Sequence, residues 1–195
     1  MTFEEYYGED FSRLKIVEEE LLELIGRYPV KETLDGIQPV LYCRSRIKKP
    51  ESMMKKLEAR GLPTDSRTAL ENMHDAVGVR VVCSFVEDVY DISRWLYTCG
   101  EFEIVDSKDY IAYPKPNGYR SLHLILRFSG GLMAEIQLRT IAIDSWAALE
   151  HQLKYKHTVG HEKIICDELK RCADEIASID VSMQALREFR FDDNE

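Results

Sequence analysis

Hydrophobic residues recur along the chain with two different spacings, which predict a mixture of helices and strands. Over residues 11–25 the apolar positions return every three or four residues, as expected for a helix with one buried face. Gly26 and Pro29 are expected to end this helix. A second helix is expected to begin at Pro50 and to stop before Gly61, because proline suits the first helical turn and glycine suits the position beyond the last.

The central part of the chain predicts strands. Residues 76–86 are rich in β-branched side chains and predict a buried strand, which a helix over 87–99 and a short strand near 102–106 are expected to follow. Residues 61–68 are expected to form a loop. The same is expected of residues 108–121, which contain two prolines and an Asn-Gly pair.

Alternating apolar and polar side chains over 122–128 and 132–139 predict a β-hairpin, joined by Ser129-Gly130-Gly131. Pairing Phe128 with Leu132 keeps apolar side chains opposite one another along both strands. The same register places three pairs on the other face: His123 opposite Gln137, Ser121 opposite Arg139, and Glu135 opposite Ile125. A face this polar does not suit a core, so we interpret it as part of a site.

Two more helical segments are expected over 140–156 and 162–189, the second as one helix or a pair. Helices and strands together predict an α/β (α+β) fold, and 195 residues of which 45% are hydrophobic suit a single domain with a sizeable core. No run approaches the roughly 20 apolar residues of a membrane span. The five cysteines are odd in number without a Cys-x-x-Cys pair, and the acidic N-terminus lacks the features of a secretion signal, so we expect a cytoplasmic protein.

Charge is distributed unevenly along the chain. The net charge of −9 argues against general binding of nucleic acid or anionic membranes. Residues 41–60, however, carry seven basic side chains against two acidic ones, a net charge of +5, so the other 175 residues sum to −14. A concentrated basic patch on an acidic protein suits a small polyanion.

Five short segments carry a family resemblance. In chain order they are Ser45-Arg46-Ile47-Lys48, Asp75-Ala76-Val77-Gly78-Val79-Arg80, Gly118-Tyr119-Arg120-Ser121-Leu122-His123, Glu135-Ile136-Gln137-Leu138-Arg139-Thr140 and Asp144-Ser145-Trp146-Ala147-Ala148-Leu149-Glu150-His151. Together they resemble the synthetase domain of the RelA/SpoT family, specifically its small alarmone synthetases of the RelP/RelQ type. The resemblance covers roughly residues 10–190.

This resemblance implies a mixed β-sheet flanked by helices, related to nucleotidyltransferase folds, with a catalytic core over residues 10–160. It implies transfer of the ATP β,γ-pyrophosphate to the 3′-hydroxyl of GDP or GTP, which yields AMP and the stringent-response alarmone ppGpp or pppGpp. It also implies that C-terminal helices over 161–190 assemble a homo-tetramer, in which an alarmone or single-stranded RNA could regulate the enzyme.

The donor half of the expected site contains cations and two carboxylates. A basic cluster that could neutralise the ATP phosphates comprises Arg46, Lys48, Ser52, Lys56 and Arg60. The resemblance implies that Arg46 and Arg80 also enclose the adenine. Asp75 and Glu135 suit Mg²⁺, which prefers a few carboxylates together with phosphate oxygens. In the family the aspartate is a metal ligand, and the glutamate is either a ligand or the group that activates the 3′-hydroxyl; the sequence leaves this choice open.

The acceptor half is expected around Tyr119, which lies between Lys115 and Arg120 and could stack on a base while the cations hold phosphates. The resemblance assigns Tyr119 to guanine. The other expected contacts to GDP or GTP are Lys108, Lys115, Arg120, His123, Gln137, Arg139 and Asp144. Asp144 could accept hydrogen bonds from the guanine N1 and N2 donors.

Two other functions remain open from the sequence. Some short relatives are toxins that pyrophosphorylate tRNA 3′-ends or adenine nucleotides, although the net charge of −9 speaks against tRNA. A non-catalytic module that binds alarmone or RNA is a third possibility, and it is disfavoured because every expected catalytic position holds a suitable residue. The preference between GDP and GTP is not determined by the sequence.

Overall fold

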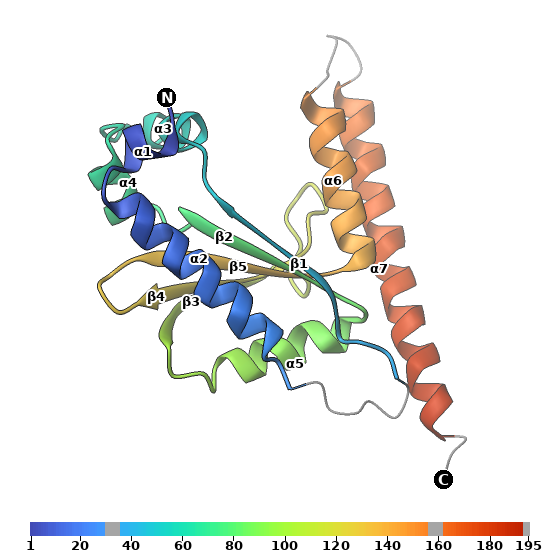
Figure 1. The fold of residues 1–195 in the computed structure, drawn as a ribbon. Coiled ribbons are helices and arrows are strands. Elements are labelled where there is room, and N and C mark those ends of the chain that lie inside the picture. Colours follow the sequence, from blue (N-terminus) through green and yellow to red (C-terminus); the bar gives the residue numbers. More distant parts are fainter. Residues whose placement is uncertain (30–35, 156–161, 193–195) are drawn as a thin grey trace.

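The computed structural model describes residues 1–29, 36–155 and 162–192, which form a central β-sheet with helices packed on it (Figure 1). The strands are β1 (Val40–Ile47), β2 (Val77–Cys83), β3 (Phe102–Asp109), β4 (Leu122–Phe128) and β5 (Met133–Thr140).

The helices lie before, between and after these strands. They are α1 (Phe3–Tyr7), α2 (Asp10–Gly26), α3 (Pro50–Glu58), α4 (Ser66–Asn72), α5 (Val86–Leu96), α6 (Ile141–Tyr155) and α7 (Glu162–Asp192). In the described part of the chain, no helix is both long and apolar enough to cross a membrane.

The sheet is mixed, as expected, with the strand order β1-β2-β5-β4-β3. Strands β2 and β5 run parallel, whereas the other neighbouring pairs are antiparallel. The predicted hairpin register is confirmed: His123 faces Gln137, Ile125 faces Glu135, and the Phe128 amide donates to the Leu132 carbonyl at 2.9 Å. Because side chains alternate along a strand, this register settles which residues share each face.

One face of the sheet forms the hydrophobic core. Val77, Val79 and Val81 of β2 pack there with apolar residues of α2 and α5 such as Leu21 and Ile92, all at most 1% exposed. Helix α2 crosses this face of the sheet (Figure 1). With α2 and α5 on one side, the polar side chains of β2, β4 and β5 point to the opposite face.

Several predicted boundaries are wrong. The loop predicted over 61–68 contains the start of α4, which Asp65 caps by accepting from the Thr68 amide. Strand β3 extends to Asp109, because it pairs with β4 down to Leu122, so Lys108 lies in a strand and not in a loop. Helix α5 begins at Val86, where the strand was expected to continue.

Helices α6 and α7 stand side by side at one end of the sheet, and α7 is a single helix from Glu162 to Asp192 (Figure 1). Two of the hydrogen bonds that anchor α7 come from α6 and from the end of β5. The Trp146 indole donates to the Leu169 carbonyl at 2.8 Å, and the Thr140 hydroxyl donates to the buried Asp180 carboxylate at 2.7 Å. The end of β5 and the start of α6 are therefore tied to α7.

Candidate active site

Polar side chains form rows across the open face of the sheet. The pairing of neighbouring strands aligns one row that runs from β1 to β3: Arg44, Arg80, Gln137, His123 and Lys108. The adjacent row places Gly78 between Arg46 and Glu135. An additional Cβ on Gly78 would have the Arg46 Cγ at 3.9 Å as its nearest side-chain atom, so the bare glycine leaves open space between a cation and a carboxylate.

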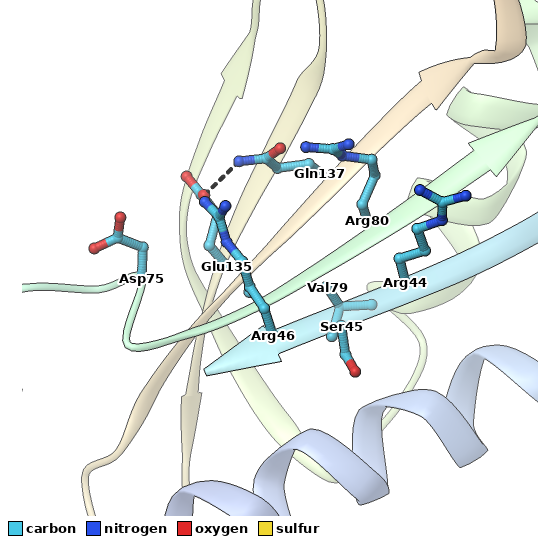
Figure 2. A pocket seen from close by; sticks show the side chains of 9 residues that line it. Arg44, Ser45, Arg46, Asp75, Val79, Arg80, Glu135 and Gln137 are labelled. Carbon is cyan, nitrogen blue, oxygen red and sulfur yellow. Dashed lines mark hydrogen bonds between the residues drawn. The ribbon is translucent and has the colours of Figure 1, made fainter. Parts of the chain in front are cut away.

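This open space is part of a cavity that we call the Asp75–Glu135 cavity (Figure 2). Its lining residues are Arg44, Ser45, Arg46, Asp75, Gly78, Val79, Arg80, Glu135 and Gln137. Two carboxylates and three arginines thus face one volume. The sequence-predicted pair Asp75 and Glu135, which are 60 residues apart in the chain, is brought together.

Asp75 precedes β2 and is held by two lysines. Lys48, which follows β1, contacts one carboxylate oxygen at 2.5 Å, and Lys56 of α3 contacts the other at 2.8 Å. Burial alone would raise the pKa of Asp75, but the hydrogen bonds and charges of Lys48 and Lys56 outweigh burial and lower it. Asp75 is therefore an ionised carboxylate whose counter-charges come from flexible side chains.

Glu135 belongs to a closed ring of hydrogen bonds, which we call the Glu135 ring. Its oxygens contact His123 Nδ1 at 3.0 Å and Gln137 Nε2 at 2.7 Å. His123 Nε2 contacts the Tyr119 hydroxyl at 2.9 Å. Arg139 closes the ring, because its Nη2 donates to the Tyr119 hydroxyl at 2.6 Å and to Gln137 Oε1 at 2.8 Å.

A neutral His123 with its proton on Nδ1 satisfies every partner in the Glu135 ring. His123 then donates to Glu135 and accepts from Tyr119, whose oxygen accepts from Arg139. Burial alone would raise the pKa of Glu135, but the contacts with His123 and Gln137 outweigh burial and lower it, while the charge of Asp75 acts to raise it. The two carboxylates are thus close enough to repel each other.

That repulsion bears on metal binding. Two ionised carboxylates that share a cavity fit a hard divalent cation, which takes oxygen ligands and completes its shell with phosphate and water. No cluster of three or more His, Cys, Asp or Glu side chains in ligating positions occurs among the described residues. The donor set therefore fits a cation that arrives with a phosphate substrate better than a permanently caged metal.

A second carboxylate centre lies beside the cavity. Asp144, in the first turn of α6, is 6% exposed and forms an ion pair with Arg80 Nη1 at 3.1 Å. It accepts hydrogen bonds from Arg139 Nη1 at 3.2 Å and from the Tyr42 hydroxyl at 2.9 Å. Burial lowers the pKa of Arg80, nearby Arg139 lowers it further, and Asp144 acts in the opposite direction. Both Asp144 oxygens are engaged with protein groups.

Three other expected site residues do not line the cavity. Ser52 is exposed on α3, and Arg60 donates to the Asn72 carbonyl at the end of α4 at 3.3 Å. Arg120 donates to the Gly118 carbonyl and, at 3.1 Å, to Asp174 of α7. The expected basic cluster is thus only partly assembled at the cavity, through Arg46, Lys48 and Lys56.

Of the two lysines expected at the acceptor, Lys115 lies over Tyr119. The Lys115 Nζ lies 4.9 Å from the centre of the Tyr119 ring and 4.5 Å from that of Tyr110. Arg139 also lies over the Tyr119 ring, at 5.1 Å. Lys108 is exposed on β3 and pairs with Asp106 at 3.0 Å.

Sequence reasoning missed the strand that supplies part of the cavity. Strand β1 was not predicted, and with it the roles of Tyr42, Arg44 and Ser45 were missed. Alternate residues of β1 point to opposite faces. In Arg44-Ser45-Arg46, however, no apolar residue occupies the core-facing position, so the apolar–polar alternation that predicts a strand is weak. Tyr42 was detectable only through its contact with Asp144, which lies 102 residues later in the chain.

Comparisons with known proteins, by sequence and by structure, both relate this chain to the family that its sequence resembles. A family model described as "Region found in RelA / SpoT proteins" matches residues 45–160. The chain is 40% identical over 161 residues to the GTP pyrophosphokinase YwaC of Bacillus subtilis. The aligned region covers 79% of this chain and 77% of that protein. It is 32% identical over 178 residues to the GTP pyrophosphokinase YjbM of the same organism, with coverage of 88% and 83%.

Solved structures are similar over most of their length. The small alarmone synthetase 1 of Bacillus subtilis bound to its product pppGpp superposes with a TM-score of 0.79 at 30% identity, over 90% of this chain and 93% of that one. The small alarmone synthetase 2 of the same organism gives a TM-score of 0.74 at 36% identity, over 92% and 99%.

Proposed function

The chain belongs to the RelA/SpoT family, and on this premise we propose that it is a small alarmone synthetase that uses ATP and GDP or GTP. The 3′-oxygen of the guanosine nucleotide attacks the β-phosphorus of ATP, and the bond from that phosphorus to the α,β-bridging oxygen breaks. AMP leaves with that oxygen, and the proton of the 3′-hydroxyl is released to solvent. The observation that carries the proposal is the Asp75–Glu135 cavity, in which two carboxylates face three arginines. The five free cysteines and the nucleotide substrates are consistent with a cytoplasmic reaction.

In the donor half, Arg46 and Arg80 enclose the adenine from neighbouring strands, and Arg44 lies beside them. Lys48 and Lys56 exchange partners when ATP binds. Without ATP they neutralise Asp75, and with ATP they turn to the triphosphate, whose charge is larger. Ser52 lies on α3, the helix that also carries Lys56, and Arg60 lies just beyond the end of that helix. Both extend the binding surface along the phosphates.

Asp75 and Glu135 hold a divalent cation, which we assign as Mg²⁺ because carboxylate and phosphate oxygens are its preferred ligands. When bound, this ion neutralises charge that builds on the transferring phosphates. The lowered pKa of Glu135 favours cation binding over removal of the 3′-hydroxyl proton, because an efficient general base has a pKa nearer to the working pH.

In the acceptor half, the Tyr119 ring stacks on guanine. Arg139 is 3% exposed and fixed by hydrogen bonds, whereas Lys115 is exposed on a loop, so Lys115 is the cation that leaves the Tyr119 ring to contact acceptor phosphates. Lys108 is near enough to join it from β3, and His123 and Gln137 hold Glu135. Arg120 contributes indirectly, because its bond to Asp174 anchors the loop that carries Tyr119.

The C-terminal region supplies the assembly surface. We assign residues 10–160 to the catalytic core and residues 161–190 to oligomerisation as a homo-tetramer. Support comes from large apolar side chains that are exposed on α6 and α7: Leu149, Leu153, Ile179, Met183, Leu186 and Phe189. An apolar surface this extensive is typical of a protein interface.

The decisive experiment is product identification by nucleotide chromatography. The purified protein with ATP, Mg²⁺ and GDP or GTP should give AMP and ppGpp or pppGpp in equal amounts. Glu135→Gln and Asp75→Asn should each lower turnover by at least about a hundredfold while leaving the melting temperature nearly unchanged. An active synthetase assayed in parallel serves as the control. No product from the wild type, or pyrophosphorylated tRNA or adenine nucleotide instead, would refute this function.

A further inference from the structure

Three adjacent strands send side chains to one carboxylate, Asp144. Tyr42 comes from β1, Arg80 from β2 and Arg139 from β5, and all three contact Asp144 within 3.2 Å. The two guanidinium groups meet the same oxygen, Oδ1, whereas the Tyr42 hydroxyl donates to Oδ2. With 6% exposure, Asp144 has little surface left for a substrate.

The two arginines need this shared partner. Their charges repel, since Arg139 acts to lower the pKa of Arg80. Within the described part of the chain, the buried Nε atoms of both arginines lack a hydrogen-bond partner. Charges removed from water are costly unless they are paired, so the one carboxylate that both guanidinium groups share limits where both can lie.

The two arginines serve different halves of the proposed site. Arg80 lines the Asp75–Glu135 cavity, where it meets the donor nucleotide. Arg139 does not line that cavity. It belongs to the Glu135 ring and lies against Tyr119, the acceptor platform. Asp144 is therefore one direct link between donor and acceptor halves, beside Gln137, which lines the cavity and accepts from Arg139.

On the basis of the proposed function, we propose that Asp144 is a positioning residue shared by both substrates: it holds Arg80 for ATP and Arg139 for the guanosine nucleotide, and Tyr42 fixes its orientation. This differs from direct recognition of guanine by Asp144. A guanine contact serves the acceptor alone, whereas a shared counter-ion serves donor and acceptor together.

Steady-state kinetics separates these roles. Asp144→Asn keeps the shape and removes the charge, so KM should rise about tenfold for ATP and about tenfold for GDP, while kcat at saturation stays within about threefold. Tyr42→Phe should raise both KM values about threefold. A role in folding alone would lower kcat through the active fraction and leave both KM values unchanged.

Matched controls exist elsewhere in the chain. Asp180→Asn alters another buried carboxylate that has a hydroxyl partner, and Tyr6→Phe removes another tyrosine hydroxyl, which donates to the Thr64 carbonyl at 2.9 Å. Both should keep wild-type KM values. If Asp144→Asn does not fold, the Tyr42→Phe result decides alone.

The proposal is overturned if Asp144→Asn raises KM only for GDP and Tyr42→Phe leaves both KM values unchanged, since this is the result expected of a direct guanine contact. It is also overturned if the wild type is fully active and both Asp144→Asn and Tyr42→Phe have wild-type KM values. An inactive wild type would refute the proposed function instead, so the two failures are distinguishable.

Discussion

Each carboxylate near the cavity meets its counter-charges in a different way. Asp75 is paired with two lysines on flexible stems, which can leave it when a more highly charged partner arrives. Glu135 is held by His123 and Gln137 within the closed Glu135 ring. Asp144 is buried between two arginines. The first carboxylate can exchange partners, whereas the other two are fixed, so ligand binding should rearrange the Asp75 side most.

Tyr119 combines a ring that can stack with a hydroxyl that belongs to the Glu135 ring. Tyr119→Phe keeps the stacking face but leaves His123 Nε2 and Arg139 Nη2 each short of a partner. We expect kcat to fall about tenfold with little change in KM for GDP. Tyr119→Ala should in addition raise that KM about tenfold or more, because stacking on a base contributes roughly 1–3 kcal/mol.

The comparison of these two variants is the control for the prediction. Equal kinetics for Tyr119→Phe and Tyr119→Ala would mean that the aromatic face contributes nothing to acceptor binding. The KM for ATP should stay near the wild-type value in both variants, because Tyr119 does not line the Asp75–Glu135 cavity.

At the scale of elements, local patterns predicted what alternation and helical period can encode. The β4–β5 register follows from apolar pairing, which by itself predicts that His123, Glu135 and Gln137 share one face. The shared cavity of Asp75 and Glu135 depends on the parallel pairing of β2 with β5, which spacing does not encode. The family resemblance implied only a mixed sheet and a shared role for the two carboxylates. Strand β1 and helix α4 were missed because their local signals are weak, and the contact of Arg120 with α7 is a tertiary one.

The anchor between α7 and the end of β5 gives a prediction about pH. Burial raises the pKa of Asp180 above its ordinary value of 3.8, and the hydrogen bond from Thr140 offsets only part of the rise. The native state thus keeps this proton at pH values where the unfolded chain has lost it. Wild-type stability contributed by Asp180 falls as the pH rises through that window. Asp180→Asn, which can still accept from Thr140, should therefore be more stable than wild type at neutral pH.

Urea denaturation at several pH values between about 4 and 7.5 would measure this difference. The advantage of Asp180→Asn should shrink as the pH falls toward the unfolded pKa. Asp174→Asn is a control of opposite sign, because hydrogen bonds from Lys170 and Arg120 lower the pKa of Asp174. A constant difference between Asp180→Asn and wild type over the whole range would contradict the assignment.

At the scale of the whole molecule, charge and apolar surface are separated. An acidic chain concentrates cations on the open face of the sheet near the cavity, which draws a nucleotide to one place while repelling longer polyanions elsewhere. The exposed apolar side chains instead gather on α6 and α7, at one end of the sheet (Figure 1). Assembly through these helices would leave the cavity accessible, and because α7 also contacts Arg120, assembly would steady the loop that carries Tyr119.

The assembly surface can be tested by adding charge to it. Met183 and Leu186 of α7 are 48% and 61% exposed, and a glutamate at either position would place an unpaired charge inside the proposed interface. Wild type should migrate near four times the chain mass of 22.7 kDa in size-exclusion chromatography with light scattering, and Met183→Glu with Leu186→Glu should shift it to smaller species. Ile16→Glu, at a similarly exposed apolar position on α2, is the matched control and should stay with the wild type. The charged variants keep every cavity residue. A monomeric wild type, or an Ile16→Glu variant that dissociates equally, would show that this helical surface does not hold copies of the chain together.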